Sequence, residues 1–332
     1  MLFKFWKLIF SSSLIISMMI TISSNSWLGM WLGLEINMLS IIPMMNNINN
    51  VYSTEASIKY FITQAMASSI ILFSIIMMSS NLFPSKFLIM MLNSAILTKM
   101  GSAPFHFWFP EVMEGQPWMM CLVLLTVQKI APFSMLNYNM NYPLYFNIII
   151  ILNMLISALI GLNQISLRKI LTFSSINHMG WMITSLLLSK TIWIIYFITY
   201  SVISWNLIMI FKYFNMFFLK QIINLFNTSM MTKLIFMMNF LSLGGLPPFI
   251  GFMPKWLTIQ IMLNNKMNIM PFLMVMLTLI TLYYYLRVMF STLMFSSNQY
   301  KITMTKPYNF WIMSINLISI IFLILSLTFL NL

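Results

Sequence analysis

The chain contains GSAPFHFWFP at residues 101–110, and GLPPFIGFMP at residues 245–254 repeats its pattern, G-x-x-P-F-x-x-x-x-P. The offset between the two is 144 residues, the difference between 101 and 245. Proline lacks the N–H that a helix needs and clashes with the preceding turn, so each stretch predicts a helix broken within a membrane. Paired broken helices favour a transporter built from two repeats, with its ion path near the breaks. The alternative is that Gly and Pro are simply common in membrane helices.

Around these stretches the composition is that of a membrane protein. Of the 332 residues, 61% are hydrophobic and only 6% are charged, whereas soluble domains carry about 25% charged residues. Apolar runs long enough to cross a hydrocarbon core recur along the chain, and their unbroken character favours helices over a barrel. The sequence therefore predicts an all-α membrane protein of about eleven spanning helices, near 5–24, 27–46, 54–80, 87–110, 118–138, 144–164, 168–188, 191–214, 233–264, 270–294 and 308–330.

The two breaks suggest how these helices are organised. We expect a single integral membrane domain with a first half-repeat over 27–138, broken at 101–110, and a second half-repeat over 144–264, broken at 245–254. The segment 270–332 is expected to supply C-terminal helices. The 37 methionines beside abundant Ile, Asn and Phe are typical of AT-rich genes read with the animal mitochondrial code. In a mitochondrial membrane the N-terminus would face the matrix and the C-terminus the intermembrane space, because basic residues concentrate on the N-terminal side. That side would hold Lys4, Lys7, Arg168, Lys169, Lys212, Lys220, Lys233, Lys301 and Lys306, against Lys86, Lys190 and Lys266 opposite.

Several classes of function are disfavoured. The formal charge of +13 would suggest nucleic acid in a soluble protein, but most of the basic residues fall singly in short loops between apolar runs, where they serve orientation. Cys121 is the single cysteine, so an internal disulfide is excluded. No cluster has metal-ligand spacing and no G-x-G-x-x-G occurs, so we expect no redox or metal cofactor in this chain.

Ionisable residues inside the apolar runs are the candidate functional groups. A charge at the bilayer centre costs about 2.5–3.5 kcal/mol on insertion scales, so each such residue needs a partner, water or a function. Lysine suits proton transfer because burial disfavours its charged form while a nearby carboxylate restores it. For a single lysine, snorkelling to a polar edge is almost as good an explanation. The candidates are Glu35, Lys99, Lys129 and Lys255, with His178 ranked lower because a hydrogen bond to a neighbouring helix explains it equally well.

Other charges are interpreted as structural. Glu55 and Lys59 have i,i+4 spacing after Ser53 and Thr54, which predicts a helix start with capping hydroxyls and an ion pair in its first turn. Two more acids precede Gly115 and are expected to face matrix water or a partner subunit: Glu111 and Glu114.

The same residues carry a family likeness over about residues 20–290. It rests on WLGLE (31–35), STEASIKYF (53–61), APFHFWFPE (103–111), QKIAP (128–132), GLNQ (161–164), RK (168–169), SSINHMGW (174–181), GLPP (245–248) and PKW (254–256). By these motifs the chain resembles the subunit 2 family of animal mitochondrial NADH dehydrogenase, in an insect-like form. This family belongs to the antiporter-like membrane subunits of respiratory complex I.

The resemblance implies an antiporter-like fold that lacks three N-terminal helices, located in the mitochondrial inner membrane. By motif it implies a proton relay in which Glu35 and Lys99 form an acid–lysine pair, Lys129 is the central lysine and Lys255 lies near the outlet. It implies coupling to NADH:ubiquinone electron transfer carried out elsewhere, with no catalytic redox site in this chain. The implied partners are other complex I membrane subunits, including further antiporter-like subunits, and lipids such as cardiolipin.

Two alternatives share parts of this interpretation. A stand-alone cation/proton antiporter would use the same buried charges but would purify as a small oligomer. A purely structural membrane scaffold would tolerate loss of all four charges. Neither the proton stoichiometry nor the entry and exit routes follow from the sequence.

Overall fold

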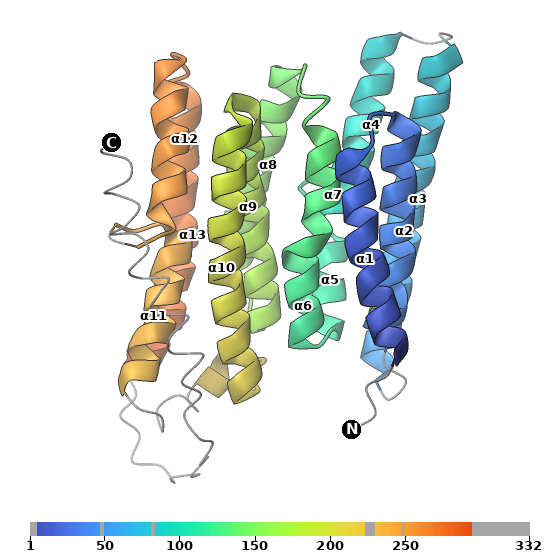
Figure 1. The fold of residues 1–332 in the computed structure, drawn as a ribbon. Helices are drawn as coiled ribbons and strands as arrows, with labels where there is room; N and C mark the ends of the chain where they lie inside the picture. Colours follow the sequence, from blue (N-terminus) through green and yellow to red (C-terminus); the bar gives the residue numbers. More distant parts are fainter. Residues whose placement is uncertain (1–4, 47–49, 81–83, 223–229, 248, 294–332) are drawn as a thin grey trace. The chain divides into compact units, whose positions relative to one another are not determined.

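The computed structural model describes residues 5–46, 50–80, 84–222, 230–247 and 249–293, which are almost entirely helical (Figure 1). The helices are α1 Phe5–Ser23, α2 Trp27–Met45, α3 Val51–Ser80, α4 Ser85–Met100, α5 Trp108–Gly115, α6 Trp118–Leu125, α7 Val127–Leu136, α8 Pro143–Leu162, α9 Leu167–Leu188, α10 Lys190–Phe214, α11 Met230–Gly244, α12 Phe252–Asn264 and α13 Ile269–Leu293.

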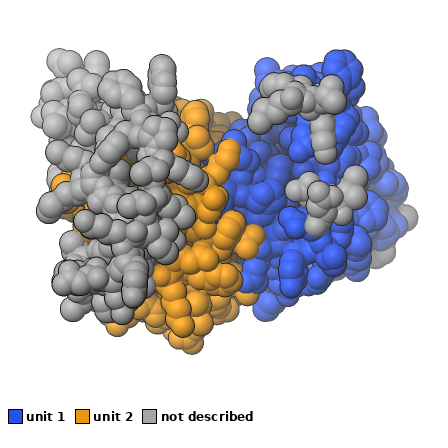
Figure 2. All heavy atoms as spheres, turned by 90° about the horizontal axis from the view of Figure 1, so that it is seen from below, with its two compact units in different colours: residues 1–149 blue, residues 150–332 orange. Residues whose placement is uncertain are grey.

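The chain divides into two compact units, residues 1–149 and 150–332, which Figure 2 colours separately. In unit 1, α3 packs against α2, α4 and α5, while α7 contacts α1, α2 and α4. In unit 2, α9 packs against α10, α12 and α13. The division follows compactness and its boundary falls inside α8, so the proposed half-repeats over 27–138 and 144–264 stay a prediction.

Each of the first ten predicted segments overlaps helical structure, and three of them, 87–110, 118–138 and 233–264, each correspond to two helices. The segment 308–330 lies outside the described residues, so the total of eleven stays a prediction. Among the described helices, seven are long and apolar enough to cross a membrane, counting α6 and α7 as one span. They are Phe5–Ser23, Trp27–Met45, Val51–Ser80, Trp118–Leu136, Pro143–Leu162, Lys190–Phe214 and Ile269–Phe290.

The predicted break at 101–110 separates α4 from α5. α4 ends at Met100, and Gly101 follows in the left-handed conformation with a φ of 73°. Its N–H bonds the carbonyls of Leu97 and Thr98 and so closes the helix. Glycine suits this position because a side chain disfavours positive φ. The chain turns through the Pro104 region and becomes helical again at Trp108.

The predicted break at 245–254 separates α11 from α12 in the same way. α11 ends at Gly244, and Gly245 has a φ of 76°. The Gly245 N–H bonds the carbonyls of Leu241 and Ser242. α12 begins at Phe252 and carries Pro254 in its first turn, where proline is tolerated because the first helical N–H groups have no intrahelical acceptor.

A third irregularity was not predicted. The segment expected as one helix over 118–138 is interrupted at Thr126, whose φ of −117° and ψ of −74° separate α6 from α7. The Thr126 hydroxyl donates to the Leu122 carbonyl at 2.8 Å, a bond that bends helices. Pro132 lies inside α7, and having no N–H it cannot donate to the carbonyl four residues earlier. α7 is therefore locally weakened.

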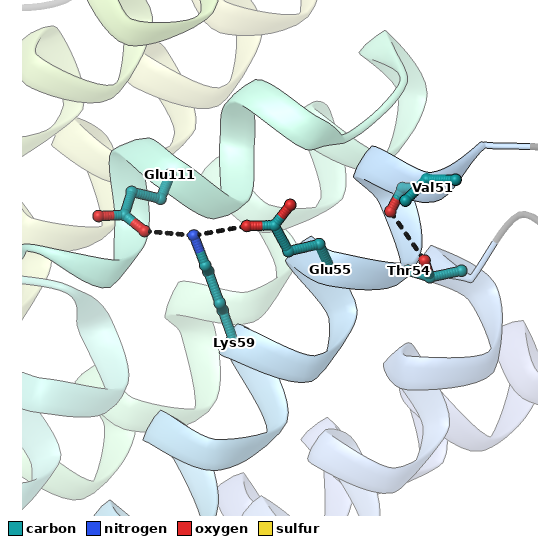
Figure 3. A network of polar contacts seen from close by, with 5 residues as sticks. All are labelled: Val51, Thr54, Glu55, Lys59 and Glu111. Atoms are coloured by element: carbon teal, nitrogen blue, oxygen red, sulfur yellow. Dashed lines mark hydrogen bonds and ion pairs between the residues drawn. The ribbon is translucent and has the colours of Figure 1, made fainter.

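The start of α3 also differs from the prediction. α3 begins at Val51 rather than after capping hydroxyls. The Ser53 hydroxyl donates to the Asn50 carbonyl and the Thr54 hydroxyl donates to the Val51 carbonyl, each at 2.7 Å. Figure 3 shows the second of these bonds. Both hydroxyls lie inside the helix and bond back to its first carbonyls, so the prediction that they act as N-caps was wrong.

The helix α9 forms the centre of unit 2. Every residue from Leu167 to Leu186 except Arg168 and Lys169 is buried. A helix buried on all sides belongs to a core rather than to an amphipathic surface. By contrast, α1 leaves most of its large apolar side chains exposed, as expected of a helix that faces lipid.

Candidate functional site

The predicted acid–lysine pair lies in unit 1. Lys99 sits in the last turn of α4 and is 7% exposed, whereas Glu35 is half-buried in the middle of α2. Lys99 interacts electrostatically with Glu35. Among the described residues, however, the Lys99 Nζ has no hydrogen-bond partner and forms no ion pair within 4.0 Å. The two groups influence each other through space without direct contact.

The predicted central lysine, Lys129, lies on α7 just after the irregularity at Thr126. It is 2% exposed. Its backbone N–H donates to the Thr126 carbonyl at 3.1 Å, and its Nζ lies 5.3 Å from the centroid of the Phe109 ring. That separation is within the range of a cation–π contact. Phe109 comes from α5, so Lys129 faces the helix that follows the first break.

The predicted outlet lysine, Lys255, lies directly at the second break in unit 2. Its Nζ donates to the Gly244 carbonyl at 2.8 Å and to the Leu243 carbonyl at 3.3 Å. These are terminal carbonyls of α11, which have no partner within their own helix and carry the negative end of its dipole. The Lys255 Nζ also lies 5.9 Å from the centroid of the Trp181 ring on α9.

The close approach of Lys255 depends on Gly245. A Cβ at position 245 would lie 2.7 Å from the Lys255 Cδ and 2.8 Å from its Nζ. Any other residue would therefore displace the lysine from the α11 carbonyls, besides meeting the positive φ. At the second break, therefore, the glycine of the repeated pattern is required both by its positive φ and by the space that Lys255 occupies.

His178 is joined to the neighbouring helix, as the alternative interpretation anticipated. Its Nδ1 lies 2.9 Å from the Tyr196 hydroxyl on α10, and its ring centroid lies 5.1 Å from that of Tyr200. A second tyrosine pair on α13 is also buried, with the Tyr284 hydroxyl donating to that of Tyr285 at 3.4 Å. This tyrosine group was not predicted, because aromatic residues in apolar runs carry no signal that separates a buried hydroxyl from one at the membrane interface.

A second polar group was missed in unit 1. Gln128, next to Lys129, donates from its Nε2 to the Asn37 Oδ1 at 2.7 Å, and its Oε1 accepts from the Tyr60 hydroxyl at 3.1 Å. These bonds join α2, α3 and α7. The sequence signal that could have indicated this group was the amide side chain of Gln128, beside the candidate lysine Lys129 in a mostly apolar segment.

The ion pair predicted between Glu55 and Lys59 is present at 2.9 Å. Lys59 also pairs with Glu111 at 2.7 Å, as Figure 3 shows. The three side chains are 43–57% exposed, so Glu111 is accessible as expected while it ties α5 to α3. Such exposed pairs contribute little to stability.

The structure brings Glu35, Lys99 and Lys129 into unit 1 and His178 and Lys255 into unit 2. Among the described residues, no group of three or more His, Cys, Asp and Glu side chains is placed to hold a metal ion. That the chain carries no cofactor stays a prediction, as does the assignment of each lysine to a relay.

Comparisons with known proteins agree with the family resemblance seen in the sequence motifs. Residues 24–281 match the family described as NADH:quinone oxidoreductase/Mrp antiporter, TM. The chain is 48% identical to NADH-ubiquinone oxidoreductase chain 2 of Anopheles gambiae, covering 93% of this chain and 92% of the relative. It is 43% identical to the protein of the same name from Locusta migratoria, covering 94% and 90%.

Solved structures support the fold. A chain of respiratory complex I from Thermus thermophilus superposes with a TM-score of 0.86 at 22% identity, over 96% of this chain and 77% of that one. A chain of the Mrp complex from Dietzia sp. superposes with a TM-score of 0.71 at 17% identity, over 83% and 58%. The fold is that of an antiporter-like membrane subunit, and the chain belongs to the NADH-ubiquinone oxidoreductase chain 2 family.

Proposed function

We propose that this chain is a non-redox subunit of NADH:ubiquinone reductase that moves protons through a relay of Glu35, Lys99, Lys129 and Lys255. Its relatives are chains of NADH-ubiquinone oxidoreductase. The observation that carries the proposal is the burial of three lysines, Lys99, Lys129 and Lys255, each beside an interruption between two helices.

The chemistry of these positions suits proton transfer. A buried ammonium is unfavourable in a low-dielectric interior, so each lysine gains from passing its proton on and each regains it when a negative group approaches. In unit 1 the negative group is the Glu35 carboxylate, which acts on Lys99. In unit 2 it is the row of terminal carbonyls of α11, which bind the Lys255 Nζ.

The interrupted helix ends provide binding groups for the transferred protons. Free carbonyls at an interrupted helix end bind cations or protonated groups, as the broken helices of other transporters do. No step in this proposal transfers an electron within the chain. NADH oxidation and quinone reduction belong to other subunits of the assembly.

Lys129→Met tests the proposal. The substitution keeps most of the side-chain volume and removes the titratable group, so coupled NADH:quinone turnover should fall about tenfold or more in the assembled enzyme. The matched control is Lys190→Met, which removes the same charge from the exposed first residue of α10. Normal turnover and a normal ratio of protons to electrons in assembled Lys129→Met enzyme would overturn the relay.

The location of the chain is inferred from its family. The chain is a multi-pass mitochondrial membrane protein, and its orientation with the N-terminus in the matrix is part of the proposal. Cysteines introduced beside Arg168 and Lys169 should react with an impermeant reagent only from the matrix side. Labelling from the intermembrane space in intact mitoplasts would reverse the orientation.

The proposal also includes the partners of the chain in the membrane. We expect the chain to lie beside other complex I membrane subunits, including further antiporter-like ones, and lipids such as cardiolipin. In native gels it should migrate within a large assembly containing NADH dehydrogenase activity. Migration as a small oligomer would favour a stand-alone cation/proton antiporter instead.

A further inference from the structure

Tyr60 on α3 is the centre of a buried contact network in unit 1. It is 3% exposed, and its hydroxyl donates to the Gln128 Oε1 at 3.1 Å. Gln128 in turn donates to the Asn37 Oδ1 at 2.7 Å, and Asn37 is 2% exposed. Polar groups surrounded by lipid-facing helices must satisfy one another, so three helices are held at fixed separations by these two bonds.

The ring of Tyr60 makes a different contact. It packs edge-on against Trp108 with the ring centroids 5.7 Å apart. Trp108 is the first residue of α5, and its Nε1 donates to the Thr98 carbonyl of α4 at 3.0 Å. Tyr60 therefore contacts α7 through its hydroxyl and α5 through its ring, and Trp108 extends the link to α4 across the first break.

The residues that follow Trp108 on α5 and Gln128 on α7 contact each other, and one of them is the relay residue Lys129. Phe109 follows Trp108 on α5, Lys129 follows Gln128 on α7, and the Lys129 Nζ lies 5.3 Å from the Phe109 ring centroid. Phe109 and Lys129 are therefore in direct contact, whereas Trp108 and Gln128 are linked through Tyr60, which touches both. Tyr60 thus contacts the residue that precedes each member of the Phe109–Lys129 contact.

The backbone of α7 gives these contacts their importance. Pro132 has no N–H to donate to the carbonyl of Gln128, the residue four positions earlier, and the chain before it is bent at Thr126. The segment that carries Lys129 is thus held less firmly by its own helix than a regular segment would be. The side-chain bonds of Gln128 supply the missing restraint.

We propose that Tyr60, acting with Gln128 and Asn37, is a positioning residue that holds Lys129 against Phe109 and transmits displacements of α5 to Lys129. The inference rests on the proposed role of Lys129 in proton transfer. Tyr60 does not itself carry a proton in this scheme. It couples the first break to the central lysine by a hydroxyl on one side and a ring on the other.

Tyr60→Phe and Asn37→Ala test the network from its two ends in the assembled enzyme. Tyr60→Phe keeps the ring against Trp108 and removes only the hydroxyl donor. Loss of one buried hydrogen bond should lower the coupled kcat about 3- to 10-fold, while assembly and the KM values for NADH and quinone stay unchanged. The double variant should lose no more than the more severe single variant, because both interrupt one network.

Tyr138→Phe is the matched control, since Tyr138 is 49% exposed and the same atom is removed. It should leave kcat unchanged. Lys129→Met is measured alongside. If Lys129→Met is impaired while Tyr60→Phe and Asn37→Ala keep normal kcat, the positioning role is wrong and the relay stands. If Lys129→Met itself is normal, the proposed function fails first. An equal loss in Tyr138→Phe, or additive losses in the double variant, would also overturn the network.

Discussion

The two helix breaks share a sequence pattern but are closed by different chemistry. At the second break the ammonium of Lys255 bonds the terminal carbonyls of α11. At the first break the neutral indole of Trp108 bonds the Thr98 carbonyl of α4. Under the 144-residue offset the counterpart of Lys255 is Glu111, which points instead to Lys59 at an accessible position. Equivalent backbones therefore carry a charged donor in unit 2 and an uncharged one in unit 1.

This difference separates two tasks that a break can perform. A helix end closed by indole keeps its donor at every pH, because the indole N–H does not titrate in the physiological range. A helix end closed by an amine holds a group that can release a proton while it still bonds the carbonyl. In unit 1 the ionisable groups, Lys99 and Lys129, lie beside the break rather than in it. We therefore expect the second break to be part of the relay and the first to be its support.

The largest effect expected from this comparison is at Lys255. Lys255→Met removes both the donor and the titratable group, and coupled turnover should fall about tenfold or more. Lys255→Arg keeps a positive donor that does not release its proton, so it should be impaired as well. Trp108→Phe removes one neutral hydrogen bond worth about 0.5–1.5 kcal/mol and should cost less than either. Proton pumping in reconstituted vesicles measures all three.

The outcome of Lys255→Arg is decisive. Normal pumping in this variant would mean that Lys255 only closes the helix end, and the two breaks would then be functionally alike. Assembly of each variant is checked by native gel before pumping is compared.

The next effect is at Glu35 and Lys99, the charges beside the first break. Glu35→Gln and Lys99→Met should each reduce coupled turnover several-fold, because each removes the opposite charge that favours the ionised form of the other residue. The double variant should lose less than the combined losses by more than about 0.5 kcal/mol. Their electrostatic interaction supports this result. Additive losses, measured by the same turnover assay, would show that the two residues act independently.

The glycines of the two breaks should differ more subtly. Gly101→Ala and Gly245→Ala both place a side chain at positive φ, which costs about 1–2 kcal/mol. Only Gly245→Ala meets the Lys255 side chain, whereas the new Cβ at 101 would meet Phe109 at 3.0 Å. Thermal inactivation should therefore be faster in both variants, but the proton-to-electron ratio should fall further in Gly245→Ala, because Gly101→Ala reaches a relay lysine only through Phe109.

Gly244→Ala is the control for these two substitutions. A Cβ at 244 would have its nearest neighbour at 3.6 Å, an ordinary contact, and the residue is helical. It should behave like the unmodified enzyme. A proton-to-electron ratio that falls as far in Gly101→Ala as in Gly245→Ala would contradict the distinction between the breaks.

The breaks themselves were predictable because Gly and Pro act on the local backbone. Gly101 and Gly245 take the left-handed conformation that ends a helix, and the surrounding prolines prevent its continuation. The irregularity at Thr126 was not predictable in the same way. Threonine in an apolar run is common inside regular helices, and Pro132 lies within α7 without ending it.

The candidate lysines were predictable for a different reason: a charge in an apolar run is costly and therefore conspicuous. Their partners were not. The bond from Gln128 to Asn37 joins residues 91 positions apart, and the bond from Tyr60 to Gln128 joins residues 68 positions apart. The carbonyls that bind Lys255 belong to the backbone, so no side-chain pattern could indicate them. Such contacts depend on how helices pack, which periodicity alone does not determine.

The smallest effect is expected at Lys59, the partner of Glu111, which is the residue that the 144-residue offset aligns with Lys255. Lys59→Met breaks both ion pairs, but all three side chains are 43–57% exposed, where water and salt screen the attraction. Coupled turnover should change by less than about twofold. Any loss of thermal stability should shrink further at high salt, and thermal inactivation at low and high ionic strength measures this. The double replacement of Glu55 and Glu111 by Gln is the control, because it removes the same pairs from the acidic side. A loss of pumping in Lys59→Met as large as in Lys255→Met would mean that the ion pair of Glu111, the residue equivalent to Lys255, is functional in unit 1. The first break would then be a second relay site rather than a support.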